Sequence, residues 1–309
     1  MPQEMAFFRG KIVPISEAKV SVMTHALHYG TAVFEGVRGN WNEAQNKLFV
    51  FRMAEHYDRL LQGCRMLLMD IPYNTEDLCN ITIELLQSCG YRQDLYIRPL
   101  AYKSQELVAN LRLQDIDSDF TLIAVPFGAY IDAEGAIDCT TSSWRRIDDT
   151  VIPPRVKISG HYVNSILAKT EAVLAGFDEA IMLTQDGNVS EGTGENLFMI
   201  TNGVIHMPLV ADNNLTGITR DSAMTLARNE LGIEIVERTI RRSELYLADE
   251  VFLTGTAAHV TPVGELDNRP IGEGGVGPIT KKIRDLYLEA IRGNNPKYID
   301  WCSGVAMEG

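Results

Sequence analysis

The chain has 309 residues, of which 45% are hydrophobic and 22% charged, and its formal net charge is −13. This composition is typical of a packed protein with two domains of ordinary size, and it excludes a disordered or fibrous chain. An acidic chain without a cluster of Lys and Arg residues is a poor partner for nucleic acid, and no apolar stretch is long enough to span a bilayer.

The five cysteines are Cys64, Cys79, Cys89, Cys139 and Cys302. Their odd number and wide spacing favour reduced thiols over a disulfide framework or a zinc site. The charges in the N-terminal segment MPQEMAFFRGKIVP are not typical of a secretory signal. We therefore expect a cytoplasmic protein that binds neither nucleic acid nor a membrane.

The first part of the chain predicts a mixture of strands and helices. Residues 25–39, HALHYGTAVFEGVRG, place Phe34, Gly36 and Arg38 on one face of a strand. Further strands are expected at 47–52, 94–102 and 120–127, and helices at 53–69 and 75–90. In the strand at 94–102, Tyr96 and Arg98 share a face, and such a pair can bind a carboxylate bidentately. The alternative is a pair of surface strands with arginines in salt bridges.

A glycine-containing, acidic stretch at 128–138, GAYIDAEGAID, is the expected linker. We expect a small N-terminal domain at 1–127 and a larger C-terminal domain at 139–309, both of α+β class, with a functional cleft between them. The second domain should contain helices at 161–177, 220–231 and 278–292, and strands at 180–185, 196–201, 233–238 and 250–255. The tail from residue 294 should be loosely attached.

Lys157, in PPRVKISGHYVNS, lies between Val156 and Ile158 early in the second block. It is either a surface lysine whose stem lies along apolar groups or an amine kept from water for chemistry. Further along, Glu191 and Glu195 lie in NVSEGTGENLFMI, a turn that runs into an apolar strand. A carboxylate there could meet a cationic ring nitrogen, although a plain loop with solvated glutamates is the alternative.

The segment LTGITRDSAMTLA, residues 215–227, places Gly217 before a helix whose N-cap we expect to be Thr219, with Asp221 in the first turn. The N–H groups of Ile218 and Thr219 could bind a phosphate, and the small-residue turn at 255–258 could bind another oxyanion. An ordinary capped helix is the alternative. His25 and His28 have a spacing that could suit a metal, but no third ligand accompanies them, so we expect no metal.

Together these segments provide an amine nucleophile, a carboxylate for a cationic ring, backbone N–H groups for phosphate and a face that binds carboxylates. Pyridoxal 5'-phosphate requires those groups, because its aldehyde bonds to a lysine, its ring nitrogen stays protonated beside an acid and its phosphate suits a helix N-terminus.

The sequence resembles the branched-chain amino acid aminotransferases of the fold-type IV pyridoxal-phosphate enzymes. The match runs from about residue 7 to 301 and rests on HALHYGTAVFEGVR, YIRPL, SSWRR, the lysine segment, SEGTGENLF, LTGITRD, SELYLADEVF and GTAAHVTP in family order. The resemblance implies the two-domain fold of D-amino acid aminotransferase-like proteins. It also implies an assembly of at least a homodimer, with a hexamer as the larger alternative.

By this resemblance, Lys157 is the Schiff-base lysine, Glu191 pairs with the pyridine nitrogen and Tyr162 bonds the phenolic oxygen of the cofactor. The implied cofactor-binding set is completed by Arg59 and Thr256 near the phosphate and by Gly194, Glu195, Asn196, Leu215, Gly217, Ile218 and Thr219. The implied substrate-binding set is Tyr29, Phe34, Gly36, Arg38, Tyr96, Arg98, Tyr130, Thr256 and Ala257.

The implied reaction is ping-pong transamination of leucine, isoleucine and valine with 2-oxoglutarate. Lys157 would act as general base at the substrate Cα. The sequence departs from the family pattern at Phe127, Thr216 and His259 and in the segment 103–115, so the substrate range is the least defined part. The alternatives are a D-amino acid or (R)-amine transaminase, aminodeoxychorismate lyase, or a catalytically silent protein that binds the same cofactor.

Overall fold

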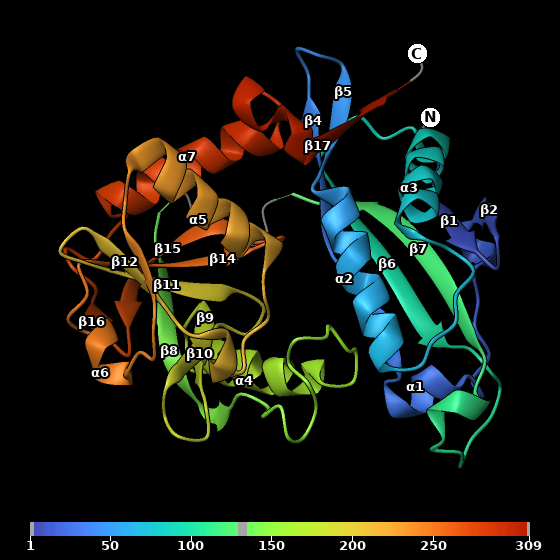
Figure 1. The fold of residues 1–309 in the computed structure, drawn as a ribbon, viewed down its shortest axis with the longest axis horizontal. Coiled ribbons are helices and arrows are strands. Elements are labelled where there is room, and N and C mark those ends of the chain that lie inside the picture. The colour runs from blue at the N-terminus through green and yellow to red at the C-terminus, as the bar shows by residue number, and fades with distance from the viewer. Residues whose placement is uncertain (1–2, 129–134, 308–309) are drawn as a thin grey trace. The chain divides into compact units, whose positions relative to one another are not determined.

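The computed structural model describes residues 3–128 and 135–307. The chain divides into two compact units (Figure 1). The first contains Met1–Gly128, Val156–Gly160 and Glu289–Gly309, and the second contains Ala129–Arg155 and His161–Leu288. The lysine segment and the C-terminal residues, which the sequence places in the second domain, therefore group with the first unit. Residues 129–134 of the expected linker lie outside the described residues.

An eight-stranded sheet in the order β17-β5-β4-β6-β7-β1-β2 forms the first unit, with β3 paired to β6. Its strands are β1 (Met5–Phe8), β2 (Lys11–Pro14), β3 (Ala32–Phe34), β4 (Val37–Asn42), β5 (Lys47–Phe51), β6 (Leu95–Lys103), β7 (Ser118–Pro126) and β17 (Cys302–Ala306). The expected strand across 34–38 is interrupted, because β3 pairs with β6 at Leu100–Tyr102 whereas β4 pairs with β6 at Leu95–Ile97. Phe34, Gly36 and Arg38 therefore do not belong to one strand.

Helices α2 (Met53–Met66) and α3 (Thr75–Cys89) confirm the two helices expected from the apolar periodicity, and they lie on one face of this sheet (Figure 1). The short helix α1 (His25–Tyr29) precedes β3. A capping box begins α3: the Asn74 side chain accepts from the Asp77 N–H, and the Asp77 carboxylate accepts from the Asn74 N–H.

The described residues of the C-terminal segment, up to residue 307, are not loosely attached, so that expectation is wrong. Strand β17 pairs antiparallel with β5 from Cys302 opposite Phe51 to Ala306 opposite Lys47. Val305 and Met307 are buried, so apolar contacts as well as backbone hydrogen bonds hold this segment in the sheet.

The second unit is built on a nine-stranded mixed sheet in the order β10-β9-β8-β15-β14-β11-β12-β13, with β16 paired to β15. Its strands are β8 (Ile137–Arg145), β9 (Glu179–Leu183), β10 (Val189–Glu191), β11 (Asn196–Thr201), β12 (Val204–Met207), β13 (Ile235–Glu237), β14 (Glu250–Gly255), β15 (His259–Leu266) and β16 (Arg269–Pro270). Its helices are α4 (Tyr162–Leu174), α5 (Ile218–Leu231), α6 (Arg242–Leu245) and α7 (Pro278–Ile291), the last of which ends in residues of the first unit.

Helix α4 confirms the expected helix but exposes its large apolar residues. The side chains that face strands β8 and β9 are small, namely Ser165, Ala168 and Ala172. The exposed apolar residues of the helix are Val163, Ile166, Leu167, Val173 and Leu174, of which Leu174 is 84% exposed. Small residues allow the helix axis to approach the sheet closely, and the large aliphatic side chains of the helix remain exposed.

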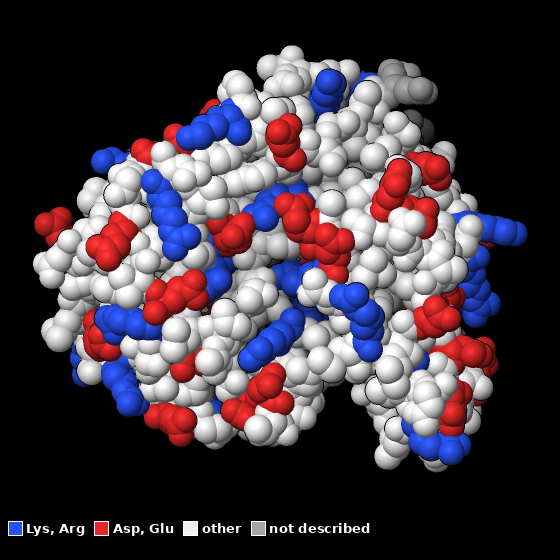
Figure 2. Space-filling view, viewed as in Figure 1, with Lys and Arg blue, Asp and Glu red and all other residues white. Residues whose placement is uncertain are grey.

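No helix in the described part of the chain is long and apolar enough to cross a membrane. On the face shown in Figure 2, acidic and basic side chains are interspersed rather than gathered into one basic field.

Candidate active site

Lys157 lies in a short extended segment that pairs with β3 in the first unit. The Phe34 N–H donates to the Lys157 carbonyl (3.1 Å), and the Ser159 N–H donates to the Ala32 carbonyl (2.8 Å). The Gly160 N–H donates to the Gly30 carbonyl (3.1 Å). These backbone bonds explain why the segment leaves the second unit and joins the first.

Two glycines permit this close approach. A Cβ at Gly30 would lie 2.5 Å from the Gly160 Cα, and Gly30 has a φ of +66°. A side chain at position 30 would therefore push Lys157 away from β3.

The side chain of Lys157 is half-buried between two buried neighbours, Val156 and Ile158. Its Nζ lies 5.2 Å from the centroid of the Phe34 ring. Partial burial beside an aromatic ring and aliphatic side chains fits a nucleophilic amine, and it equally fits a lysine whose stem lies along apolar groups.

Arg98, Tyr96 and Phe34 form a second part of this cluster. Arg98 Nη2 donates to the Tyr96 hydroxyl (3.0 Å), which confirms that the two side chains share a face. The guanidinium lies 4.6 Å from the Phe34 ring centroid, and its buried Nε has no hydrogen-bond partner among the described residues. Gly36 makes room for this arrangement, since a Cβ there would lie 2.0 Å from the Tyr96 hydroxyl.

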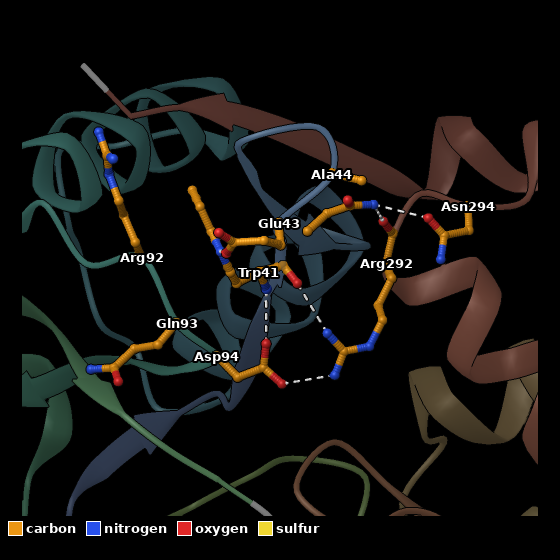
Figure 3. A pocket seen from close by; sticks show the side chains of 9 residues that line it. Trp41, Glu43, Ala44, Arg92, Gln93, Asp94, Arg292 and Asn294 are labelled. Atoms are coloured by element: carbon orange, nitrogen blue, oxygen red, sulfur yellow. Dashed lines mark hydrogen bonds and ion pairs between the residues drawn. The ribbon is translucent and has the colours of Figure 1, made fainter. Parts of the chain in front are cut away.

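Arg38 is held differently from Arg98. Its Nη1 donates to the Gly128 carbonyl (3.1 Å), its guanidinium lies 5.1 Å from the Phe127 ring centroid, and its Nη2 lies 3.9 Å from Asp94. Figure 3 shows Asp94 between Trp41 and Arg292: the carboxylate accepts from the Trp41 N–H (2.8 Å) and from Arg292 Nη2 (3.0 Å). Arg38 therefore has a protein carboxylate nearby.

Arg59, expected to bind phosphate, pairs with Glu35 in the same unit. Arg59 Nε and Nη2 donate to the two Glu35 carboxylate oxygens at 2.6 and 2.7 Å, and His56 Nδ1 lies 2.8 Å from Glu35 Oε2. Burial would raise the pKa of Glu35, but the Arg59 charge and the hydrogen bonds from His56 and Arg59 lower that pKa well below its usual range. Glu35 is part of the FEGVR motif, yet nothing in the sequence assigned it a partner.

Tyr29 and Tyr130 are two further candidates for the substrate site. The Tyr29 hydroxyl accepts from the Ala109 N–H (2.9 Å), which joins α1 to the segment that follows β6. Tyr130 lies outside the described residues.

In the second unit, Glu191 is 4% exposed and both of its oxygens have partners. Oε1 lies 2.8 Å from Arg146 Nη2, and Oε2 accepts from Asn196 Nδ2 and from the Leu215 N–H, both at 3.1 Å. Asn196 Nδ2 also donates to the Leu215 carbonyl (2.7 Å), which joins the turn to the segment before α5. Arg146 is the last residue of the SSWRR segment, and it is not among the site residues expected from the sequence.

Glu195 is also buried, so neither glutamate of the turn is solvated. Its Oε2 accepts from the Gly194 N–H (3.0 Å). Burial and the negative charge of Glu179 raise the pKa of Glu195 to about 8. Glu179 itself accepts from Lys169 Nζ and from the Thr193 hydroxyl, both at 2.7 Å.

Helix α5 begins at Ile218 with Gly217 as its N-cap, so the expected cap at Thr219 is wrong. A Cβ at Gly217 would lie 2.1 Å from Asn196 Oδ1, because the chain passes close to the turn that carries Glu191. Asp221 lies in the first turn, as expected. Thr256 and Ala257 lie in the turn between β14 and β15, and Tyr162 is the first residue of α4.

The two histidines with metal-like spacing are engaged elsewhere. His25 Nε2 lies 2.8 Å from the Asn110 carbonyl oxygen, and His28 Nε2 lies 2.7 Å from the Val22 carbonyl oxygen. Residues 3–128 and 135–307 contain no group of three or more His, Cys, Asp or Glu side chains that could hold a metal ion.

A family model described as Amino-transferase class IV matches residues 32–266. A probable branched-chain-amino-acid aminotransferase of Aquifex aeolicus (strain VF5) is 50% identical over 302 residues, which cover 98% of this chain and 97% of that relative. The solved branched-chain aminotransferase of Thermoproteus uzoniensis with norvaline is 40% identical, with a TM-score of 0.93 over 98% of this chain and 99% of that chain.

The solved branched-chain amino acid aminotransferase of Thermobaculum terrenum, in its PLP-form or holo-form, is 36% identical. Its TM-score is 0.94, and the match covers 99% of this chain and 99% of that chain. The expected α+β fold is confirmed by these near-complete matches.

Proposed function

This chain belongs to the class IV aminotransferases, fold-type IV enzymes that use pyridoxal 5'-phosphate, and on that premise we propose that it transfers the amino group of L-leucine, L-isoleucine or L-valine to 2-oxoglutarate. The observation that carries the substrate class is full-length similarity, at 50% identity, to a probable branched-chain-amino-acid aminotransferase. The products are the branched 2-oxo acids and L-glutamate.

The residues present fit the cofactor. Lys157 supplies a half-buried amine, and Glu191 supplies a buried carboxylate held in one orientation. The start of α5 after Gly217, together with Arg59 and Thr256, supplies donors for a phosphate. Tyr162 supplies a hydroxyl for the phenolic oxygen. Gly194, Glu195, Asn196 and Leu215 shape the turn beside Glu191.

When bound, the cofactor supplies an electron-accepting ring that stabilises the carbanion formed at the substrate Cα. Lys157 would act as the general base that removes the Cα proton of the substrate. Glu191 would hold the ring nitrogen of the cofactor protonated as its anionic partner. Phe34 and the aliphatic neighbours of Lys157 exclude water from the amine.

Arg98 is the residue that binds the second carboxylate of glutamate and 2-oxoglutarate. Among the described residues it makes no ion pair, it contacts Tyr96 and Phe34, and its buried Nε has no hydrogen-bond partner. Because arginine does not lose its proton, a half-buried guanidinium of this kind suits an anionic ligand. Tyr29, Gly36, Arg38, Tyr130 and Ala257 complete the substrate side.

The functional assembly is a homodimer or a larger oligomer of dimers, such as a hexamer. Exposed apolar residues gather on α1, on the segment before it and on residues 107–111, namely Val20, Val22, Met23, Leu27, Val108 and Leu111. The Leu107 N–H donates to the Met23 carbonyl (3.0 Å), which joins these segments into one surface. A patch of this kind, like the exposed face of α4, is typical of a protein interface. Light scattering of the wild type decides between the assemblies.

The enzyme works in the cytoplasm, a location that suits its five free cysteines.

The decisive experiment is an absorbance spectrum of the purified protein, followed by addition of L-leucine. We expect a yellow protein whose spectrum changes with L-leucine and recovers with 2-oxoglutarate. Borohydride reduction should fix the cofactor to Lys157, as read by peptide mass spectrometry, and Lys157→Ala should lose transamination. Labelling of another residue, or an active Lys157→Ala variant, would overturn the proposal. Faster turnover of D-alanine or (R)-1-phenylethylamine would assign the chain to a sister enzyme.

A further inference from the structure

The carboxylate of Glu191 meets a buried cation of its own unit. Arg146 follows β8 directly and is 3% exposed. Its backbone N–H donates to the Leu183 carbonyl (2.8 Å), and its Nη1 donates to the Ser165 hydroxyl in the first turn of α4 (2.9 Å). The first bond fixes the backbone at Arg146 and the second orients its guanidinium, whose Nη2 lies 2.8 Å from Glu191 Oε1.

A comparison inside the same turn shows what this cation does. Glu195 is as buried as Glu191, but no guanidinium of the described residues pairs with it, and burial beside Glu179 raises its pKa to about 8. A buried carboxylate without a cation binds a proton more tightly, whereas an adjacent guanidinium favours the anion. The charged groups around Glu191 include Arg146, which contacts it, and Glu195. Glu179 lies near Glu195 and pairs with Lys169.

We propose that Arg146 is a positioning residue that keeps the proton of the Glu191–pyridine pair on the ring nitrogen. This inference rests on the proposed function, in which Glu191 faces that nitrogen. Arg146 lowers the proton affinity of the Glu191 carboxylate, so the proton shared by the pair stays on the ring and the ring stays cationic. Without the guanidinium the proton moves to the buried carboxylate, and a neutral ring withdraws fewer electrons from the reacting carbon.

The other carboxylate oxygen of Glu191, Oε2, accepts only uncharged donors among the bonds described above. Asn196 and Leu215 bind Oε2 and orient the carboxylate, but neither carries a charge. Several groups therefore orient the carboxylate, and among these contacts Arg146 is the one that brings a positive charge to it.

The test uses the cofactor-loaded enzyme with Arg146→Gln and Arg146→Lys. A neutral ring makes the nitrogen that joins the cofactor to Lys157 more basic, so the pH midpoint of the cofactor absorbance should rise in Arg146→Gln. The kcat for L-leucine should fall about 10- to 100-fold, the usual effect of losing a group that orients and tunes a ligating residue, while KM changes little. Arg146→Lys keeps a cation without the fork, so both effects should have the same sign and be smaller.

The matched control is Arg145→Met, because Arg145 is the adjacent arginine and is exposed. It should keep the wild-type midpoint and kcat. A wild-type midpoint in Arg146→Gln would overturn the inference, and if that variant does not fold, a wild-type midpoint and kcat in Arg146→Lys would do so. A wild-type protein that binds no cofactor or does not use L-leucine would instead count against the proposed function.

Discussion

Glu35 in the first unit and Glu195 in the second are both almost fully buried, yet the protein moves their pKa values in opposite directions. Glu35 accepts two hydrogen bonds from Arg59 and lies beside His56, and its pKa is lowered despite the opposing effect of burial. Glu195 accepts one backbone N–H and lies near Glu179, and its pKa is raised to about 8.

The comparison shows that the partner, rather than burial, decides the charge of an internal carboxyl group. Burial disfavours the anion at both positions. A guanidinium within hydrogen-bonding distance outweighs that cost at Glu35, whereas a second carboxylate adds to it at Glu195. The surroundings of Glu191 resemble those of Glu35 rather than those of Glu195, because Arg146 contacts the Glu191 carboxylate directly.

The largest effect should come from Glu35→Gln, which removes the buried anion that Arg59 and His56 contact. Breaking a buried ion pair in this way typically costs 3–5 kcal/mol, and we expect about 3 kcal/mol at pH 7, measured by urea unfolding. Glu55→Gln is the matched control, because Glu55 pairs with Arg52 at 2.8 Å but is 43% exposed, and its loss should cost about 1 kcal/mol or less. Equal losses in the two variants would contradict the account of Glu35.

The same variant defines an acidic pH window. Because the pKa of Glu35 is lowered in the folded protein, its contribution is present above the unfolded value of about 4.3 and is lost as the pH falls below it. Burial lowers the pKa of His56, so its contribution is likewise lost as the pH falls below the unfolded value of about 6.5. The difference between wild type and Glu35→Gln should therefore shrink as the pH falls from about 4.3 to about 3, between the unfolded and the folded pKa of Glu35. A difference that is as large at about pH 3 as at about pH 7 would show that the ion pair is not its origin.

Arg98 differs from Glu195 because it keeps its charge. It is partly buried, and no counter-ion for it is found among the described residues. Glu195 can become neutral, but arginine cannot, and in the proposed function the counter-ion of Arg98 is the second carboxylate of the substrate. In Arg98→Met we expect the KM values for glutamate and 2-oxoglutarate to rise about 10- to 100-fold, since a hydrogen bond to a charged group contributes about 1.5–3 kcal/mol. The KM for L-leucine should change much less. Arg65→Met, an exposed arginine of α2, should leave all three KM values unchanged. Equal losses with glutamate and leucine would remove Arg98 from this role.

The sequence predicts features that depend on local residue patterns, but it does not predict contacts between residues that are far apart in the chain. Features with strong local signals were placed correctly: the helices α2 and α3, the shared face of Tyr96 and Arg98, and the strand that follows the glutamate turn. The lysine segment was expected in the second domain but groups with the first unit. The ion pairs that set the charge of the buried carboxylates were missed. Glu35 and Arg59, for example, are 24 residues apart, and their pairing exists only in the folded chain. The attachment of β17 to β5 and the exposed aliphatic face of α4 were missed for a related reason. A local apolar pattern shows that a segment is amphipathic, but it does not show whether the sheet packs against its large or its small residues.

The smallest effect, and the one with a change of sign, should come from Glu195→Gln. At about pH 4 the wild-type carboxyl is protonated in the folded protein and mostly protonated in the unfolded chain, so the neutral amide is a close substitute and we expect a change within about 1 kcal/mol in urea unfolding. A group whose folded pKa is raised contributes stability below its unfolded value and loses that contribution as the pH rises through its folded value, here about 8. At pH 9 the wild type must ionise a buried acid beside Glu179, whereas the variant does not, so Glu195→Gln should be the more stable protein. The exposed Glu273→Gln should show no such dependence on pH. A Glu195→Gln variant that loses the same stability at about pH 4 and at about pH 9 would mean that Glu195 is ionised in the folded protein, and the contrast with Glu35 would fail.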